Sequence, residues 1–442
     1  MPKITFMGAG STIFARNVLG DCMCTPSLQN SEIALYDIDA KRLEESATIL
    51  RAINKNINES RAVIKTYHGV DKRKDALRDA DFVVNAIQVG LYDPCTIIDF
   101  EVPKKYGLRQ TIADTLGIGG IMRALRTIPV LEDFAQDIEE VCPDAWLLNY
   151  TNPMPMLAGY MQRYTDVKTV GLCHSVQGCS YWLLKDLGME DKLEGRRELI
   201  AGINHMGWLL KLADKDGNDL YPEIRKRAAK KNATEKHSDM VRYEYIKRFG
   251  YYCTESSEHN AEYNPFFIKS NYPDLIDRYN IPLDEYPRRC VEQIKGWEKE
   301  RDEIHQDGKA THTRSNEYAS YIMDAMISNE AYKIGGNVLN TGGLIENLPA
   351  DACVEIPCLV DGSGVNPTYV GKLPVQLAAM NMTNVNVHLM TIEAARTRNV
   401  DNIYQAAMFD PHTAAELSID DIVKMCDELI DAHGDYMSMY KG

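Results

Sequence analysis

Two kinds of periodicity alternate in the first 175 residues, and this alternation constrains the fold more than any other feature of the sequence. Short apolar runs of β character are separated by stretches long enough for helices. The apolar runs are 4–7, 32–36, 62–67, 82–87, 146–150 and 167–173. Continuous apolar strands need helices on both faces of their sheet. The pattern therefore predicts an α/β fold, with a Rossmann-type, doubly wound, mostly parallel sheet in residues 1–175.

The rhythm changes after residue 175, where helical and β patterns no longer alternate regularly. The expected elements are a helix over 176–187, β structure over 199–212, charged helices over 221–249, an aromatic loop over 250–265, and two strands within 335–357 among later helices. Residues 176–442 are therefore predicted to form a second, mixed α+β domain. We expect it to hold catalytic and substrate-binding residues and to mediate oligomerisation.

The charge balance excludes several classes of partner. Lys and Arg number 49 against 64 Asp and Glu, so the formal net charge is −15 and no basic surface is available for nucleic acid or an anionic membrane.

The N-terminus lacks a signal-peptide pattern, and no run of about 18 apolar residues follows. The eleven cysteines include no CxxC pair, so neither a zinc ribbon nor a thioredoxin-type site is indicated, and we expect most of them to be reduced, buried thiols. We expect a cytoplasmic protein without a nucleic-acid or membrane partner.

A glycine-rich turn directly follows the first predicted strand. There, bare backbone N–H groups and the positive end of the next helix can hold a pyrophosphate. The third glycine of GxGxxG is absent because Ile13 occupies its place, and a turn needed only for helix–strand packing is the alternative. Asp37, at the end of the second strand, can accept hydrogen bonds from the ribose hydroxyls, and its negative charge disfavours a 2′-phosphate. We predict NAD as the cofactor, bound by Gly8, Ala9, Gly10, Ser11, Thr12 and Asp37.

Polar residues also follow the later strands, at the carboxyl edge where such sheets bind ligands. Asn149 and Asn152 can donate to or accept from a hydroxyl, although an Asn-Pro turn that only starts a helix explains them equally well. Asp114 precedes a pair of glycines and is either a carboxylate near the site or a helix N-cap.

Cys173 and His205 end two further β-type runs and suggest a metal site. A thiolate and an imidazole are suitable ligands for a divalent transition metal, and two protein ligands leave positions open for a substrate. The alternative is a buried thiol and a core histidine. The spacing alone leaves both interpretations open.

Taken together, these motifs resemble the family 4 glycoside hydrolases. They occur in that family's order and at about its separations, and residues 337–357 resemble its late segment, so the likeness covers the whole chain. The sequence Cys-His-Ser-Val-Gln-Gly at 173–178 is most similar to the α-galactosidase (melibiase) branch. These NAD-dependent enzymes depart from the two-carboxylate scheme of most glycosidases.

The resemblance implies a metal and a sugar site. Cys173 and His205 would bind Mn²⁺, or another divalent transition metal, whose coordination the sugar oxygens O2 and O3 complete. Asn149 and Asn152 would contact the sugar. Asp114 falls where the family has an acidic residue near the metal.

The resemblance also implies the remaining catalytic residues. His174 would be the general acid. It occupies a position that is often Asp in the 6-phosphoglucosidases, and this difference favours an unphosphorylated sugar. The family uses Tyr or Asp as the base at C2. We predict Tyr252 for this role; the same loop also offers Tyr251, Glu255, Glu258 and His259.

The implied activity is hydrolysis of α-galactosides through oxidation at C3. NAD⁺ would remove the C3 hydride, the base would take the C2 proton, and the C1 oxygen would leave with help from the acid. Addition of water and return of the hydride complete the reaction without net redox change. We expect a homodimer or homotetramer.

Three other functions stay open at this point. An α-glucuronidase or α-galacturonidase needs a cation for the C6 carboxylate, and Arg288 and Arg289 are available. A dehydrogenase of the lactate or malate type shares the glycine turn and the Asn-Pro, but it needs no metal and releases NADH. An NAD-responsive binding protein needs neither the acid nor the metal.

Overall fold

The six strands predicted in the first 175 residues form the parallel part of one sheet. The computed structural model describes residues 1–307 and 310–441, and the side chains of these residues except 298–307. The strands of the whole sheet are β1 (Lys3–Met7), β2 (Glu32–Asp37), β3 (Val63–His68), β4 (Phe82–Asn85), β5 (Trp146–Asn149), β6 (Lys168–Leu172), β7 (Arg197–Ile203), β8 (Met206–Ala213), β9 (Tyr252–Cys253), β10 (Tyr332–Leu339), β11 (Cys353–Asp361) and β12 (Gly364–Pro367). The helices are α1 (Thr12–Met23), α2 (Ala40–Asn58), α3 (Arg73–Leu77), α4 (Ile97–Lys105), α5 (Gly117–Val141), α6 (Met154–Tyr164), α7 (His174–Asp186), α8 (Tyr221–Thr234), α9 (Met240–Phe249), α10 (Ser257–Glu262), α11 (Asp274–Arg278), α12 (Glu285–Asp307), α13 (Ala319–Ser328), α14 (Val375–Thr397), α15 (Val400–Phe409), α16 (Pro411–Glu416) and α17 (Ile419–His433), followed by the 3₁₀ segment η4 (Gly434–Tyr440).

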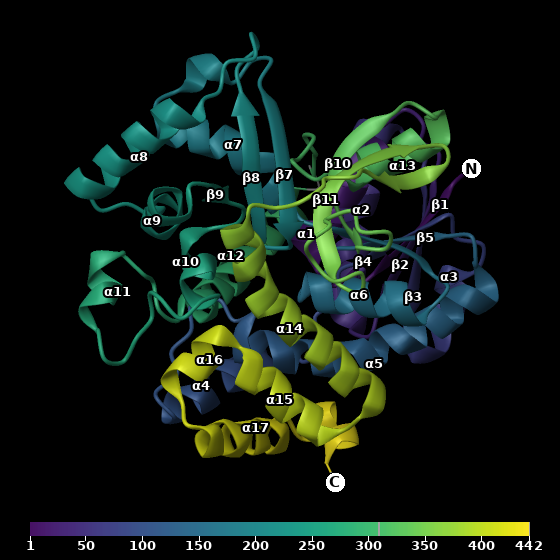
Figure 1. Cartoon of the computed structure of the whole chain (residues 1–442). Coiled ribbons are helices and arrows are strands. Elements are labelled where there is room, and N and C mark those ends of the chain that lie inside the picture. Colours follow the sequence, from purple (N-terminus) through teal and green to yellow (C-terminus); the bar gives the residue numbers. More distant parts are fainter. Residues whose placement is uncertain (308–309, 442) are drawn as a thin grey trace.

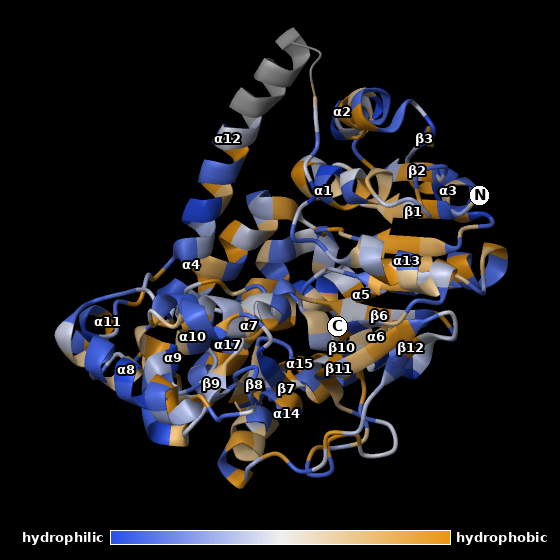
Figure 2. Ribbon diagram, turned by 90° about the horizontal axis from the view of Figure 1, so that it is seen from above, coloured by the Kyte–Doolittle hydropathy of each residue, from blue (hydrophilic) through white to orange (hydrophobic). Residues whose placement is uncertain are grey.

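The parallel strands lie in the order β3-β2-β1-β4-β5-β6. This is the order of a dinucleotide-binding, doubly wound sheet, so the predicted fold class is confirmed. Alternate side chains of β1 face opposite layers: Ile4 and Phe6 pack in one cluster with α1 and α2, and Met7 packs in the other with α5 and α6. The inner strands are accordingly apolar (Figure 2), and β4 is buried along its whole length.

The sheet continues beyond the parallel strands. β10 runs antiparallel to β6, and β11, β7, β8 and β9 follow it in space (Figure 1). The two strands predicted within 335–357 are β10 and β11, which pair with each other over their length. The division into domains at residue 175 stays a prediction, since the same sheet runs through both parts.

Two segments that bear on the site differ in detail from the expected elements. The β run 199–212 is a hairpin in which Asn204 and His205 form the turn between β7 and β8. The expected aromatic loop 250–265 contains β9, which pairs with β8, and the short helix α10. His205 and the 250–265 segment are therefore brought together through β8.

The C-terminal helices return to the first part of the chain. α14 and α15 pack on α5, and α17 packs on α4, as the yellow and blue ribbons of Figure 1 show. None of the described helices is long and apolar enough to cross a membrane. The segment η4, which follows α17, packs on α17 and α5.

Candidate active site

A cavity of about 720 Å³ lies at the carboxyl ends of β1, β2 and β4. Gly8, on its wall, has φ +88, and a Cβ there would stand 2.8 Å from the carbonyl oxygen of Ala86. A Cβ at Gly10 would stand 2.8 Å from Asp37 Oδ2. Only bare backbone fits at Gly8, and a Cβ at Gly10 would displace the Asp37 carboxylate, so the turn is a cradle of the kind that a pyrophosphate requires.

The other predicted cofactor residues divide into two groups. Asp37 lines the cavity, and its Oδ2 accepts a hydrogen bond from the backbone N–H of Gly10 at 2.6 Å. Ala9 and Thr12 are not among the described residues that line it. Ala9 is fully buried, and Thr12 Oγ1 donates to the carbonyl of Gly10 at 3.3 Å. These two residues support the turn on the side that faces away from the cavity.

The C-terminal segment η4 supplies part of the cavity wall through Tyr436 and Met439. It follows His433, whose Nε2 lies 2.9 Å from Asp99 Oδ1. Asp99 also forms a buried ion pair of 2.7 Å with Arg126, which lines the cavity. This segment contains no local motif that indicates its position, so its place in the wall was not predicted from the sequence.

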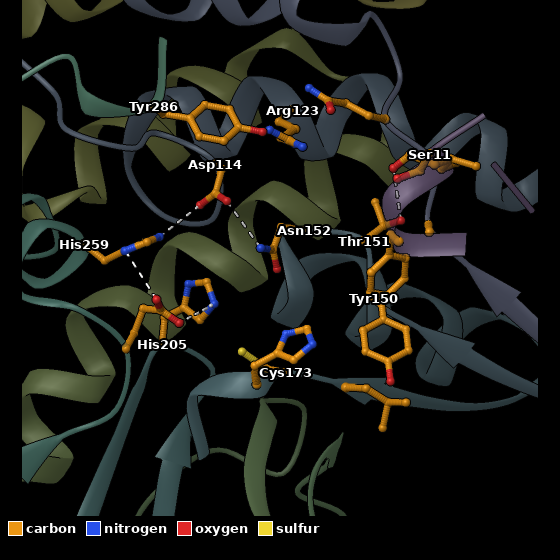
Figure 3. A pocket seen from close by; sticks show the side chains of 17 residues that line it. Ser11, Asp114, Arg123, Tyr150, Thr151, Asn152, Cys173, His205, His259 and Tyr286 are labelled. Atoms are coloured by element: carbon orange, nitrogen blue, oxygen red, sulfur yellow. Dashed lines mark hydrogen bonds and ion pairs between the residues drawn. The ribbon is translucent and has the colours of Figure 1, made fainter. Parts of the chain in front are cut away.

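A second pocket of about 400 Å³ adjoins the first (Figure 3). Ser11, Ala86, Ile87 and Gln88 line both. The remaining walls come from segments far apart in the sequence: the ends of β5 and β6, the loop before α5, the β7–β8 turn, the segment around α10 and the start of α12. A ligand in the first cavity can therefore touch a ligand in the second.

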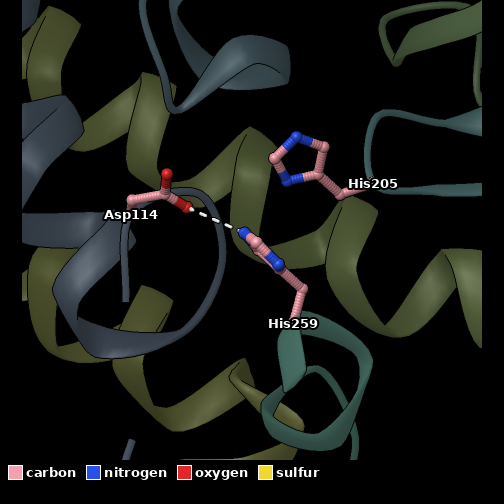
Figure 4. A group of neighbouring side chains, drawn as sticks. All are labelled: Asp114, His205 and His259. Carbon is pink, nitrogen blue, oxygen red and sulfur yellow. Dashed lines mark ion pairs between the residues drawn. The ribbon is translucent and has the colours of Figure 1, made fainter. Parts of the chain in front are cut away.

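Cys173 and His205 meet at this second pocket. Together with Glu255 they offer ligand atoms that lie within 4.8 Å of one another, and Asp114, His205 and His259 form an overlapping group (Figure 4). His205 Nε2 is 3.4 Å from Glu255 Oε2, and His259 Nε2 is 3.8 Å from Asp114 Oδ1. Sulfur, imidazole and carboxylate donors in this arrangement are able to hold a divalent transition metal.

Three of the segments that form the pocket have unfavourable backbone conformations. His205 has φ 63, Glu255 has φ 64, and Ala113, next to Asp114, has φ 55. Residues with a Cβ rarely adopt such angles, and the cost is of the order of 1 kcal/mol each. The surrounding structure must therefore hold these side chains in place.

Glu355, on β11, provides such support behind His205. It is fully buried, and its Oε1 accepts hydrogen bonds of 3.0 Å from the side-chain amides of Asn204 and Asn337. Burial raises the pKa of Glu355 to about 7, against the opposing effect of the two amides. The carboxyl thus fixes the residue that precedes His205 in the turn.

The ionisable groups around the metal-ligand group shift one another's pKa values. Burial by itself lowers the pKa of His205, but Glu255 and Cys173 outweigh it and raise the pKa to about 10. Burial raises the pKa of Asp114 and of Glu255, yet the neighbouring imidazoles hold both below their usual values. The pKa of His259 is lowered, chiefly by burial.

His174 begins α7 and lines the pocket next to Cys173. Its Nε2 lies 2.6 Å from Glu317 Oε2. Burial lowers the pKa of His174, but Glu317 more than offsets this and leaves the pKa raised. A protonated imidazole that faces a pocket is able to act as a general acid.

The two asparagines predicted to contact a sugar have different surroundings. Asn152 lines the pocket, and its Nδ2 donates to Asp114 Oδ2 at 3.4 Å. Asn149 is buried outside the lining of the described pocket; its Oδ1 accepts from Asn85 and its Nδ2 donates to the carbonyl of Thr151. The structure brings Asn152 to the site and uses Asn149 to join neighbouring strand ends.

Tyr252, the residue predicted as the base, lies away from the pocket. It is 1% exposed and packs in the cluster beneath α8 and α9, where its hydroxyl donates to Asp239 Oδ2 at 2.6 Å. Its direction follows from the pairing of β9 with β8, which places Tyr252 opposite Leu209. In the same segment, Glu255 and His259 line the pocket instead.

Some residues at the pocket were not predicted from the sequence. Arg123 on α5 and Tyr286 on α12 line the wall, and the hydroxyl of Tyr263 lies 3.1 Å from His205 Nδ1. Arg288 and Arg289, considered for a C6 carboxylate, are not among the described lining residues and pair with Glu285. No local motif distinguishes these arginines, since only packing decides which one reaches the pocket.

Comparison with known proteins identifies relatives along the whole chain. The family 4 glycosyl hydrolase model matches residues 3–189, and the model of that family's C-terminal domain matches residues 200–413. An α-galactosidase of Bacillus subtilis (strain 168) is 62% identical over 441 residues, 100% of both chains. An α-galacturonidase of Thermoanaerobacter italicus is 28% identical, over 98% of this chain and 97% of its own.

A solved structure has the same fold. The 6-phospho-α-glucosidase from gut microorganisms, in complex with NAD and Mn²⁺, superimposes with a TM-score of 0.80 at 20% identity and covers 98% of both chains.

Proposed function

Because the chain belongs to the family 4 glycosyl hydrolases, we propose that it is an α-galactosidase that uses NAD and Mn²⁺. The α-galactosidase at 62% identity supports the choice of sugar. One observation carries the proposal: Cys173 and His205 meet at a pocket that shares a wall with the dinucleotide cavity. A lactate- or malate-type dehydrogenase has no use for this pair.

The residues present fit both cofactors. The turn at Gly8 and Gly10 carries no Cβ, so a pyrophosphate can approach the N-terminus of α1 closely, and Asp37 stands at the ribose end. Cys173, His205 and Glu255 supply the sulfur, nitrogen and oxygen donors of an open metal site.

The side chains divide the chemistry among them. When bound, NAD would supply hydride exchange at C3 of the sugar, and Mn²⁺ would supply Lewis-acid polarisation of the C3 oxygen. His174, whose pKa is raised by Glu317, donates its proton to the leaving oxygen at C1. Asn152 and Asp114 position the sugar hydroxyls.

The base at C2 is His259, or Glu255 if the overlapping group of Asp114, His205 and His259 holds the metal instead. These are the residues of the 250–259 segment that line the pocket in the described structure, so we transfer to them the role expected of Tyr252. Glu255→Gln and His259→Asn should differ in the rate of exchange at C2, and the variant that loses exchange while still binding sugar identifies the base.

The test is a set of nitrophenyl glycosides with NAD⁺, Mn²⁺ and a thiol reductant. We expect cleavage of the α-galactoside, with deuterium from D₂O at C2 of the released sugar and protium kept at C3. Cleavage without C2 labelling would contradict the mechanism. Preference for the α-galacturonide would indicate an α-galacturonidase instead. Accumulation of NADH in step with product would indicate a dehydrogenase.

Two further points belong to the proposal. A cytoplasmic location is supported by the eleven cysteines, all of them free thiols. A homodimer or homotetramer is expected, and light scattering coupled to size-exclusion chromatography tests it.

A further inference from the structure

Arg123 is a buried cation on the wall of the catalytic pocket. It is 8% exposed, and no carboxylate of the described residues forms an ion pair with it. Tyr286 lies beside it, with its ring centroid 5.8 Å from the guanidinium carbon. Arg126, one turn later on the same helix, is by contrast bound by both carboxylate oxygens of Asp99.

This contrast has an energetic meaning. Burial of a guanidinium is costly unless its donors and charge are met. Arg126 meets this condition through a complete bidentate pair. Arg123 depends on Tyr286 and on the field of Asp114, and it faces a pocket that receives a ligand. Acceptor oxygens of that ligand can satisfy the remaining donors.

The position of Arg123 indicates which part of a sugar it meets. In Figure 3, Arg123 and Tyr286 lie across the pocket from Cys173, with Asp114 and Asn152 between them. The proposed function places O2 and O3 at the metal end and the C1 oxygen at His174. The opposite edge of the ring carries O4 and the substituent at C6.

We propose that Arg123 and Tyr286 form the subsite for the oxygens at C4 and C6 of the glycone, and so select the sugar. This inference rests on the proposed function for the orientation of the ring. Hydroxyl and carboxylate oxygens share the acceptor chemistry that the subsite requires, and the substrates used in the test separate them.

The test compares wild type, Arg123→Met and Tyr286→Phe on nitrophenyl α-galactoside and its 4-deoxy and 6-deoxy analogues. Arg→Met keeps the length of the side chain and removes its donors. We expect Arg123→Met to lower kcat/KM for the α-galactoside about 10²-fold, and to lower it much less for the analogue that lacks the contacted oxygen. NAD⁺ and Mn²⁺ affinities, measured by calorimetry, should not change. Arg288→Met, on an exposed arginine outside the pocket lining, is the matched control.

Several outcomes decide the matter. An equal loss on all three substrates, or weaker cofactor binding by Arg123→Met, would overturn the subsite and leave a structural role. If wild type prefers the α-galacturonide and Arg123→Met abolishes that preference, the subsite stands while the α-galactosidase proposal fails. If wild type cleaves no glycoside, calorimetry with galactose and 6-deoxygalactose still decides, since equal losses of affinity in Arg123→Met would overturn the proposal.

Discussion

The dinucleotide cavity and the catalytic pocket share a wall but are built in different ways. The cavity uses turns that directly follow β1, β2 and β4, and its critical surface is bare backbone. The pocket collects side chains from segments spread from Ser11 to Tyr286, and His205 and Glu255 adopt strained backbone angles. A site made of backbone depends on local geometry, whereas a site made of buried charges depends on everything packed behind it.

The largest expected effect separates the two sites. Cys173→Ser should lower kcat/KM about 10³-fold, because the Lewis acid contributes several kcal/mol to transition-state stabilisation. NAD⁺ affinity, measured by calorimetry, should stay at the wild-type value because the cavity does not include Cys173. Wild-type activity of Cys173→Ser without added Mn²⁺ would refute the metal assignment.

The proton donor gives the next effect. His174→Asn should lower kcat/KM about 10²-fold or more on alkyl α-galactosides, and less on nitrophenyl galactosides, whose leaving group needs little protonation. Glu317→Gln removes the charge that raises the pKa of His174, so the alkaline limb of the pH profile should move to lower pH. Equal losses on both kinds of substrate would argue against His174 as the acid.

The support behind the pocket should make stability pH-dependent. The pKa of Glu355 rises from its ordinary value of 4.5 to about 7 in the folded protein. Between these values the folded state binds the extra proton, so the free energy of unfolding should fall as pH rises, by about 2 kcal/mol. In Glu355→Gln, the free energy of unfolding, measured by urea denaturation at pH 5 and pH 8, should fall by correspondingly less than in wild type. An unchanged pH dependence would show that Glu355 does not carry it.

A smaller effect is expected at the dinucleotide cavity, where Asp37 affects the choice between NAD⁺ and NADP⁺. Wild type should prefer NAD⁺ to NADP⁺, because Asp37 repels a 2′-phosphate. Asp37→Asn should narrow the ratio of the two dissociation constants about tenfold, the value of one hydrogen bond to a charged group. Tighter NADP⁺ binding by the wild type would mean that another residue makes this choice.

The smallest effect concerns the part of the cavity wall that comes from the C-terminus. Tyr436→Ala should weaken NAD⁺ binding about threefold, through loss of one aromatic contact. Tyr272→Ala, at an exposed tyrosine outside both linings, is the control. Equal dissociation constants for the two variants would mean that η4 does not touch the cofactor.

The sequence by itself determined the features whose signals are local. The strand–helix alternation placed the six parallel strands within two residues of their observed ends, and chain direction put Gly8, Asp37 and Cys173 at the carboxyl edge of the sheet. In a doubly wound sheet this edge binds the ligand, so position along the chain already implied position in space.

Only the tertiary structure decided which side chains face the pocket. Tyr252 and Glu255 are three residues apart, yet the pairing of β9 with β8 directs the tyrosine into the core while Glu255 reaches His205. Arg123 and Arg126 lie on one helix, and Asp99 of α4 neutralises only the second. Each of these outcomes depends on a partner distant in sequence, and the direction of a side chain is set by the packing of that partner, which a local pattern does not contain.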